Sequence, residues 1–349
     1  MRILLAGFIG GMVLAGWVHV NGMQAAGGAQ QPELTVLKAD FMPGEKTIFF
    51  DDFTDMAAGD APSHFKVRGA APELRVGGGI RQLTEVQTGS LFPNITSLPK
   101  NFTYEAEVQF ENLRSARTAL ILYSSDKEAL IWWIYAAPQP QQTQLVVAVK
   151  NHTEELARKN VQVNWSQPAK IALWVQNGRV RAFINGEKHV DANQVELPAI
   201  NKVEILSVIA GANQAIGYRS VRFAESTPDF SQVISASGRY VSHGILFDTG
   251  SDRLKPESAA VIQSIARGLE TNPSLKVLIE GHTDSVGNAA QNLDLSRRRA
   301  EAVKAVLASQ FKVDASRLTT AGLGATKPLD TNDTPQGRNQ NRRVEFVKQ

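Results

Sequence analysis

A cluster of acidic, amide and arginine side chains at positions 284–299 has the spacing of a binding site for a small charged ligand. The apolar run 277–279 predicts a strand and a helical pattern begins at about Asn288, so Asp284 falls in the turn between them. On the helix, Asn288, Asn292 and Arg299 lie within roughly 40° of one another. Asp284 can accept hydrogen bonds from an ammonium group, and Arg299 can donate two parallel bonds to a carboxylate. The pattern therefore indicates a site that binds a zwitterion, not a catalytic site.

The surrounding pattern predicts the elements that position this cluster. The helix, from 288 to about 310, has an apolar stripe that should pack on a sheet, formed by Leu293, Ala300, Val303 and Leu307. A second helix begins at Pro256. Strands are predicted over 240–247, 276–280, 318–321 and 342–347. The β-α-β-α-β-β order over 239–349 predicts an α/β domain, in which a mixed sheet has two helices on one face.

These residues resemble the OmpA-like peptidoglycan-binding domain. The resemblance runs from about 240 to 349 and rests on 279–284, Gly287, Asn292-x-x-Leu295-Ser296-x-x-Arg299-Ala300, Arg317-Leu318, Gly322-x-Gly324, Pro328, Asn332-x-Thr334, Gly337-Arg338 and 341–346. It implies that Asp284 binds the free amine, and Arg299 the free carboxylate, of diaminopimelate in the peptidoglycan stem peptide. It also implies a protein without catalytic activity or cofactor, exported to the periplasm or outer membrane of a Gram-negative bacterium.

The resemblance assigns further residues to the same site. The set expected to bind peptidoglycan is Asp284, Arg299, Asn292, Asp248, Thr249 and Thr283. Asn292 would assist the two charged groups, and backbone N–H groups near Asp248 and Thr249 would complete the cradle. Arg338 and Arg342 match positions that hold the last strand against the site, so we expect a structural role for them.

Simpler explanations remain open for some of these side chains. Asp284 could cap the helix that follows it, a common role for Asp in such a turn. Arg297 and Arg298 are expected on a solvated face. For His282 we expect a packed or backbone-bonded histidine, because no second His or Cys lies at the spacing of a metal site.

Composition narrows the class of partner. The 349 residues suffice for two domains with their own cores. The net charge is +3, and from Gly238 onward there are 16 basic and 12 acidic residues, against 21 and 22 before it. This excess suits a polyanionic wall and is too small to indicate nucleic acid. Cysteine is absent, so stability must come from packing and no lipid anchor can be attached through Cys.

Residues 1–29 have the pattern of an export signal peptide. Arg2 supplies a positive start, the run 3–20 is apolar, and small residues follow at 25–29. A membrane anchor is the alternative, because 18 residues approach the length of a span. The glycines inside the run and the small residues behind it favour cleavage, which would leave no transmembrane span in the mature chain. Residues 30–44 are expected to be a lead-in without regular structure.

The region 45–224 has the period-two pattern of an all-β sandwich, or jelly roll. The clearest strand alternates Phe102, Tyr104, Ala106, Val108 and Phe110 with polar residues. The pairs 177–178 and 185–186 are Asn-Gly, which favours tight hairpin turns. Only 153–158 is compatible with a helix. The Ser-rich segment 225–238 is expected to link this domain to the next.

The stretch 173–187 resembles the strand-hairpin-strand passage of laminin-G and concanavalin-like jelly rolls. That resemblance leaves the partner of the sandwich open between a glycan and an envelope protein. Its tryptophans could stack on sugar rings, although core packing is favoured. They are Trp132, Trp133, Trp165 and Trp174. Asp51, Asp52 and Asp55 could bind Ca²⁺ through their oxygens, but a solvated turn is the favoured interpretation and we predict no metal.

Two functions of different classes follow. In the first, the protein binds peptidoglycan through diaminopimelate and tethers its sandwich to the cell wall. In the second, the sandwich is a lectin-like domain that binds carbohydrate or protein, and the C-terminal domain only retains it in the envelope. They differ in whether 45–224 has a ligand of its own.

The signal pattern yields a prediction about processing. If the apolar run is a cleaved signal, the mature protein should begin between about Ala25 and Gln31. N-terminal sequencing of the exported protein measures this. Retention of Met1 would instead identify a membrane anchor.

Overall fold

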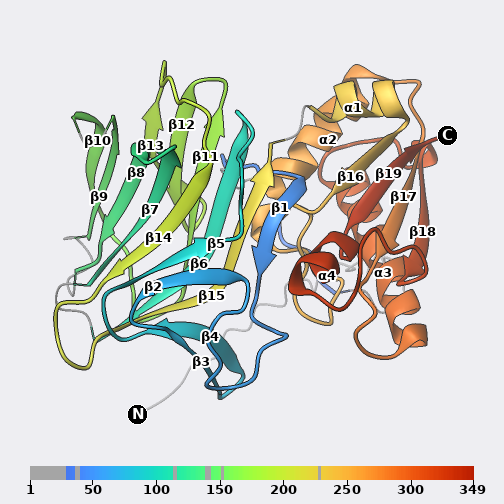
Figure 1. Cartoon of the computed structure of the whole chain (residues 1–349). Helices are drawn as coiled ribbons and strands as arrows, with labels where there is room; N and C mark the ends of the chain where they lie inside the picture. Colours follow the sequence, from blue (N-terminus) through green and yellow to red (C-terminus); the bar gives the residue numbers. More distant parts are fainter. Residues whose placement is uncertain (1–28, 36–39, 113–115, 138–142, 151–152, 227–228) are drawn as a thin grey trace, which may run out of the picture.

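The protein has two domains that lie side by side (Figure 1). The structure, a computed structural model, describes residues 29–35, 40–112, 116–137, 143–150, 153–226 and 229–349. Two large β-sheets form the N-terminal domain, and a four-stranded mixed sheet with helices forms the C-terminal domain. The predicted fold class is therefore confirmed. Nearly all of the predicted signal peptide lies outside the described residues.

The sandwich consists of an eight-stranded and a seven-stranded sheet. The eight-stranded sheet has the order β13 (Glu187–Ala192), β12 (Arg179–Ile184), β11 (Ala169–Gln176), β6 (Phe102–Glu111), β15 (Ala215–Glu225), β4 (Ile80–Glu85) and β3 (Glu73–Gly77), and β1 (Lys46–Asp51) also pairs with β15. The seven-stranded sheet has the order β10 (Glu154–Val161), β9 (Thr143–Val149), β8 (Lys127–Tyr135), β7 (Arg117–Ser124), β14 (Lys202–Val208), β5 (Gly89–Pro93) and β2 (Phe65–Gly69). Every pairing in both sheets is antiparallel.

The inner faces of the two sheets form one apolar core. The alternating side chains of β6, from Phe102 to Phe110, all lie in it, as the period-two pattern predicted. Trp132 and Trp165 are almost fully buried there, whereas Trp133 lies in a small cluster outside this core. Residues 153–158 are not helical, because β10 pairs along its length with β9.

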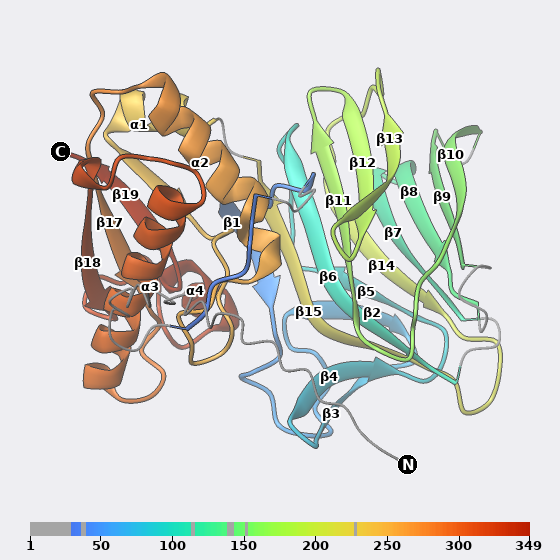
Figure 2. The ribbon, with the colours of Figure 1, turned by 180° about the vertical axis from the view of Figure 1, so that it is seen from behind.

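The C-terminal domain has the predicted strand and helix order with additions. Its elements are α1 (Phe230–Ser237), β16 (Arg239–Ser242), η2 (Pro256–Ser258), α2 (Ala259–Thr271), β17 (Val277–His282), α3 (Ala289–Ser309), η3 (Ala315–Arg317), β18 (Leu318–Gly324), α4 (Pro335–Asn341) and β19 (Val344–Lys348). The sheet order is β16-β19-β17-β18, in which only β17 and β18 are parallel. Helices α2 and α3 cover one face (Figure 2). In the part of the chain that the structure describes, no helix combines the length and apolarity needed to cross a membrane.

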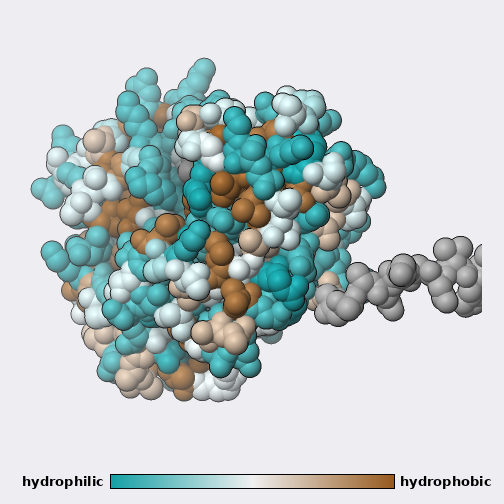
Figure 3. All heavy atoms as spheres, turned by 90° about the vertical axis from the view of Figure 1, so that its right-hand side faces the viewer, coloured by the Kyte–Doolittle hydropathy of each residue, from teal (hydrophilic) through white to brown (hydrophobic). Residues whose placement is uncertain are grey.

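The apolar stripe that the sequence predicts for α3 is only partly buried. Seen from its outer side, the domain is mostly hydrophilic with separate hydrophobic patches (Figure 3). Ala300, Val303 and Leu307 are buried, but Leu293 is 48% exposed. The backbone of Leu293 faces Gly324, with its Cα 3.2 Å from the position of a Cβ there. Its side chain therefore points away from the sheet.

The segment predicted as a linker, 225–238, contains helix α1. Asp229 caps the helix by accepting a hydrogen bond from the Ser231 backbone N–H at 2.7 Å, and Gly238 ends it with φ 71°. Phe230 and Ile234 are buried in the core of the C-terminal domain. This part of the linker prediction is wrong, because two apolar residues one turn apart suffice to anchor a short capped helix.

The lead-in also belongs structurally to the C-terminal domain. Leu34 is fully buried in its core, and the Leu34 backbone N–H donates to Gln310 Oε1 at 2.8 Å. Figure 2 shows this segment crossing the helical face of the domain. Residues 30–44 contain no helix or strand where they are described, as expected, but they are docked on the domain.

Residues 42–45 join the two domains. Met42 packs against the C-terminal core and also against an apolar cluster on the outer face of the sandwich. The buried carboxylate of Glu45 accepts hydrogen bonds from Ser242 Oγ at 2.9 Å and from the His243 backbone N–H at 2.5 Å. Burial raises the pKa of Glu45, and these donors oppose that rise. Further contacts between the domains include Lys170 with Glu257, Thr47 with Asn339 and Thr54 with Arg338.

We expect Leu34→Ala to destabilise the C-terminal domain. Removal of a fully buried leucine side chain leaves a cavity and should lower the free energy of unfolding by about 2–5 kcal/mol. Leu329→Ala is the matched control, because Leu329 is 55% exposed on the same domain. Urea unfolding of both variants measures the difference. Equal stabilities would show that the lead-in does not dock.

Acidification should weaken the domain boundary through His243. Burial lowers the pKa of this histidine from 6.5 to about 4, with Arg222 as a further cause. The unfolded chain therefore binds a proton that the folded chain excludes, and the free energy of unfolding should fall by about 1.4 kcal/mol per pH unit as the pH drops from 6.5 to 4. His243→Gln should flatten this slope in urea unfolding at several pH values. A slope unchanged in the variant would exclude His243 as its source.

Candidate functional site

The strand-turn-helix corner depends on close packing between α3 and the strands β17 and β18. A Cβ on Gly281 would lie 2.2 Å from the backbone oxygen of Ser296, and one on Gly322 would lie 2.3 Å from the backbone nitrogen of Arg297. Ser296 is fully buried, and its Oγ accepts a hydrogen bond from the Gly324 backbone N–H at 2.9 Å. Only glycine allows α3 to lie this close, which places the turn after β17 beside the first turns of the helix.

Asp284 presents its carboxylate at this turn. Its Oδ2 accepts a hydrogen bond from Arg342 Nη1 at 2.7 Å, and its Oδ1 accepts one from the Val286 backbone N–H at 3.1 Å. Each carboxylate oxygen can accept two bonds, so capacity remains for a donor from a ligand. Asp284 does not cap α3. The cap is Asn288, whose side chain accepts from the backbone N–H groups of Ala290 and Gln291.

Arg299 faces this corner from α3 and is largely removed from water. Its Nε donates to the backbone oxygen of Ser251 at 2.9 Å, and its guanidinium carbon lies 4.8 Å from the centre of the Phe247 ring. Burial lowers the pKa of Arg299 to about 10, the positive charge of Arg342 adds to this, and Asp284 opposes it. Arg299 therefore remains charged at neutral pH. Its contacts in the described part of the chain are carbonyl oxygens and a ring, without a hydrogen-bonded carboxylate.

Two of the expected ligand contacts instead support the turn. Asn292 Nδ2 donates to the backbone oxygens of Asp284 at 3.3 Å and Val286 at 2.9 Å. Thr283 is buried, and its Oγ1 donates to the Asp284 backbone oxygen at 2.7 Å. Both side chains hold Asp284 in place through its backbone, and their contact with a ligand stays a prediction.

The loop 248–251 differs in detail from the expected cradle. The Asp248 backbone N–H already donates to the Arg253 backbone oxygen at 2.9 Å, so it is not free for a ligand. The Asp248 backbone oxygen lies 3.5 Å from Arg299 Nη2, and its carboxylate pairs with Arg253. Thr249 is exposed at the turn that follows. The loop therefore positions the arginine, and Thr249 stays a candidate for ligand contact.

The two C-terminal arginines have different roles. Arg338 is buried and donates to the backbone oxygens of Asn332 and Asp333, which matches the structural role expected for it. Arg342 contacts Asp284 directly and so forms part of the site. It also reaches the sandwich, where Asp52 Oδ2 lies 3.7 Å from its Nη2. The sequence assigned Arg342 only a supporting position, because its contact with Asp284 depends on the folding of the C-terminal domain and its contact with Asp52 depends on how the two domains pack.

The three aspartates considered for calcium do not converge on one point. Asp51 and Asp55 approach each other with His64, which the sequence did not single out. His64 Nδ1 lies 3.0 Å from Asp51 Oδ2, and His64 Nε2 lies 3.5 Å from Asp55 Oδ2. Asp52 instead faces Arg342 and accepts hydrogen bonds from Thr54. Asp51 is fully buried and is held by the Phe53 backbone N–H and by His64, so the solvated turn expected from the sequence is wrong for Asp51.

His282 is packed inside the C-terminal domain, as expected. Its backbone N–H donates to the Arg343 backbone oxygen at 3.0 Å, and its side chain is 1% exposed. Burial lowers its pKa to about 3, so the ring is neutral. The neighbouring carboxylates of Glu280 and Glu345 pair with Arg239, and that of Glu345 also with Arg343. Arg239 and Arg343 thus contact one oxygen of Glu280 and both oxygens of Glu345.

The geometry brings two positive groups and one carboxylate together at the edge of the sheet. Arg299 offers a partly dehydrated cation to an anion, and Asp284 offers acceptor oxygens to a donor. A ligand with a carboxylate and an ammonium group in one small unit satisfies both. No general base or nucleophile is needed for such binding.

Comparisons with known proteins place this site in a family. A family model described as the OmpA family matches residues 246–342. The putative lipoprotein YfiB of Escherichia coli (strain K12) is 37% identical over 134 residues, which cover 38% of this chain and 79% of that protein. Outer membrane porin F of Pseudomonas aeruginosa is 42% identical over 101 residues, which cover 29% of each protein.

A solved structure, the peptidoglycan-associated lipoprotein from Burkholderia pseudomallei, is 32% identical over 33% of this chain and 92% of its own, with a TM-score of 0.29. The chain spans less than a third of porin F and 48% of the probable lipoprotein YiaD of Escherichia coli. The likeness is therefore one of a domain, and it rests on sequence identity over that domain. By the match over residues 246–342 and the identity to YfiB, this chain belongs to the OmpA family.

Proposed function

We propose that this protein binds peptidoglycan through the diaminopimelate of the stem peptide and holds its sandwich at the cell wall of a Gram-negative bacterium. The observation that carries the proposal is Arg299, a partly buried cation near the acceptor Asp284 that has no hydrogen-bonded carboxylate among the residues the structure describes. Relatives described as outer membrane porins, outer-membrane lipoproteins and a peptidoglycan-associated lipoprotein support a place in the envelope. The proposed role is binding, without catalysis or a cofactor.

The free end of diaminopimelate carries a carboxylate and an ammonium on one carbon, so it matches the two charges of the site. Arg299 donates two parallel N–H bonds to the carboxylate, which adds a hydrogen-bonded anion to a guanidinium whose hydrogen bonds within the described chain go to carbonyl oxygens. Asp284 accepts from the ammonium with the oxygen capacity that Arg342 and Val286 leave unused. Asn292 and Thr283 keep the Asp284 turn in place.

Arg342 adjusts the strength of this binding. Its guanidinium competes with the ammonium for Asp284 and repels a second cation, yet it also attracts the carboxylate of the ligand. Because Arg342 also faces Asp52 of the sandwich, it can shift toward that carboxylate when an ammonium approaches Asp284. The sandwich therefore has a direct electrostatic connection to the site.

The pairing of charges makes the effect of substitution predictable. Arg299→Ala and Asp284→Ala should each weaken retention on purified sacculi at least about tenfold, because a hydrogen bond to a charged group contributes about 1.5–3 kcal/mol. Arg299→Lys should restore little, since an ammonium cannot donate two parallel bonds in one plane. Pull-down of the mature chain with sacculi measures these effects.

Arg297→Ala is the matched control for Arg299→Ala. It removes the same charge from the same helix, but Arg297 is 52% exposed and pairs with Asp294 and Glu301. It should retain nearly wild-type binding. Undiminished retention of the folded double variant Asp284→Ala/Arg299→Ala would remove this corner from the binding site.

A further inference from the structure

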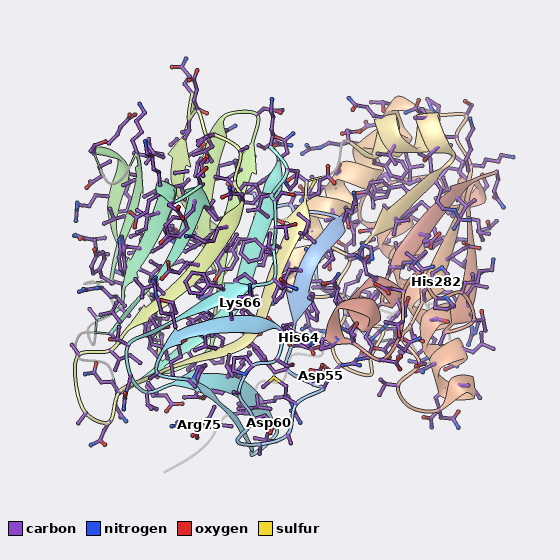
Figure 4. All side chains as sticks on the ribbon, viewed as in Figure 1. Asp55, Asp60, His64, Lys66, Arg75 and His282 are labelled. Atoms are coloured by element: carbon purple, nitrogen blue, oxygen red, sulfur yellow. The ribbon has the colours of Figure 1, made fainter. Side chains whose placement is uncertain are left out.

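A pocket lies where the sandwich meets the C-terminal domain. It has a volume of about 450 Å³. The sandwich contributes Phe49, Phe50, Ser63, His64, Phe65, Lys66 and Asn94, and the C-terminal domain contributes Asp330, Thr334, Pro335 and Gln336. Figure 4 shows His64 at the side of the sandwich that faces α4. Neither domain forms this pocket alone.

Arg342 lies between the pocket and the proposed diaminopimelate site. The ring of Phe50 forms part of its wall, and the centre of that ring lies 6.0 Å from the guanidinium carbon of Arg342. Arg342 Nη1 in turn lies 2.7 Å from Asp284 Oδ2. With standard bond lengths, the Phe50 ring is therefore at most roughly 10 Å from the Asp284 carboxylate.

The lining combines an apolar floor with a polar rim. Phe49 and Phe65 are buried and pack against each other with ring centres 5.1 Å apart, while Phe50 is half-exposed. Asn94 supplies an exposed amide from the sandwich, and Gln336 supplies a half-exposed one from α4. An amide both donates and accepts, so this rim suits a neutral ligand with hydroxyl and amide groups.

The charges of the pocket argue against a strongly ionic ligand. Lys66 and Asp330 are both exposed at the pocket and have opposite signs. His64 is occupied by its contacts with Asp51 and Asp55. A ring with one apolar face and polar substituents at its edge, such as a sugar, suits a pocket lined by both aromatic rings and amides.

We propose that this pocket binds an N-acetylated amino sugar of the same peptidoglycan strand whose stem peptide occupies Asp284 and Arg299. This inference rests on the proposed function and adds a second subsite to it. In peptidoglycan, two amino-acid residues and a short acyl linker separate diaminopimelate from the sugar that carries the peptide. The side chain of diaminopimelate, two residues that span about 7 Å when extended, and the acyl linker together exceed the roughly 10 Å between the Asp284 carboxylate and the Phe50 ring, so the sugar can reach the pocket without a fully extended peptide. The sandwich then contributes to ligand recognition and is not only a domain that the C-terminal domain tethers to the wall.

The test compares two ligands on the mature chain. One is a sugar-free tripeptide that ends in diaminopimelate, and the other is the same tripeptide attached to its N-acetylated disaccharide. Isothermal titration should show tighter binding of the disaccharide form by about threefold to tenfold, which corresponds to one neutral hydrogen bond or more. Asn94→Ala and Gln336→Ala should each reduce this advantage and leave the affinity for the tripeptide unchanged.

Gln162→Ala is the matched control, because Gln162 is an exposed amide of the sandwich that does not line the pocket. It should keep the full advantage of the disaccharide form. Asp284→Ala should weaken binding of both ligands, because both need the diaminopimelate site.

The outcomes separate the two proposals. Equal affinities of the wild-type chain for the two ligands would overturn the sugar subsite and leave the diaminopimelate site standing. If a sugar-free pentapeptide gained affinity that Asn94→Ala removed, the pocket would hold peptide and the sugar assignment would be wrong. A further outcome is that the disaccharide alone binds while the tripeptide does not. If Asn94→Ala then abolished disaccharide binding, sugar binding by the pocket would be supported and the proposed diaminopimelate site would be rejected. Failure of every ligand would reject both.

Discussion

The close approach of α3 to β17 and β18 is the constraint on which the site depends. It requires Gly281 and Gly322, where a Cβ would overlap the helix backbone, and it buries Ser296 at the contact. Protein interiors are packed too densely to absorb such an overlap without moving the helix. A shift of α3 would separate Arg299, which it carries, from the Asp284 turn at the end of β17. The motif glycines are therefore needed for the geometry of the proposed binding site although they offer it no polar side chain.

The charge of Arg299 is only partly compensated by its neighbours, and this favours the binding of an anion in the proposed site. Burial lowers the pKa of Arg299 to about 10, and Arg342 adds repulsion, so the folded chain bears a cost for keeping this cation charged. An anion that binds to Arg299 offsets this free-energy cost, because it places a negative charge next to a guanidinium that is largely shielded from water. Asp284 differs, since a backbone N–H and Arg342 already hold it. The proposed ligand would therefore meet one cation without a hydrogen-bonded carboxylate among the described residues, Arg299, and one carboxylate that it shares with Arg342, Asp284.

The packing between the domains gives the sandwich access to this site. Glu45 places a buried carboxylate against the end of β16, and Met42 contacts apolar clusters on both sides of the boundary. These contacts bring Phe50 and Asp52 next to Arg342. The lead-in, which has no regular secondary structure, and the adjoining Glu45 therefore help to fix how the two domains pack against each other. The sandwich is placed next to the groups proposed to bind the wall and is not a distant attachment.

The sequence by itself determined the sandwich, the mixed α/β domain and the placement of Asp284 and Arg299 on one strand-turn-helix corner. These follow from local periodicity and from a motif whose members lie within about twenty positions of one another. It missed α1, although Asp229 and Gly238 are cap residues, because eight residues with few apolar positions give a weak helical pattern. It also missed the docking of Leu34 and the contacts of Arg342 with Asp284 and Asp52. Those contacts join residues tens to hundreds of positions apart, so only the packing of the folded chain decides them.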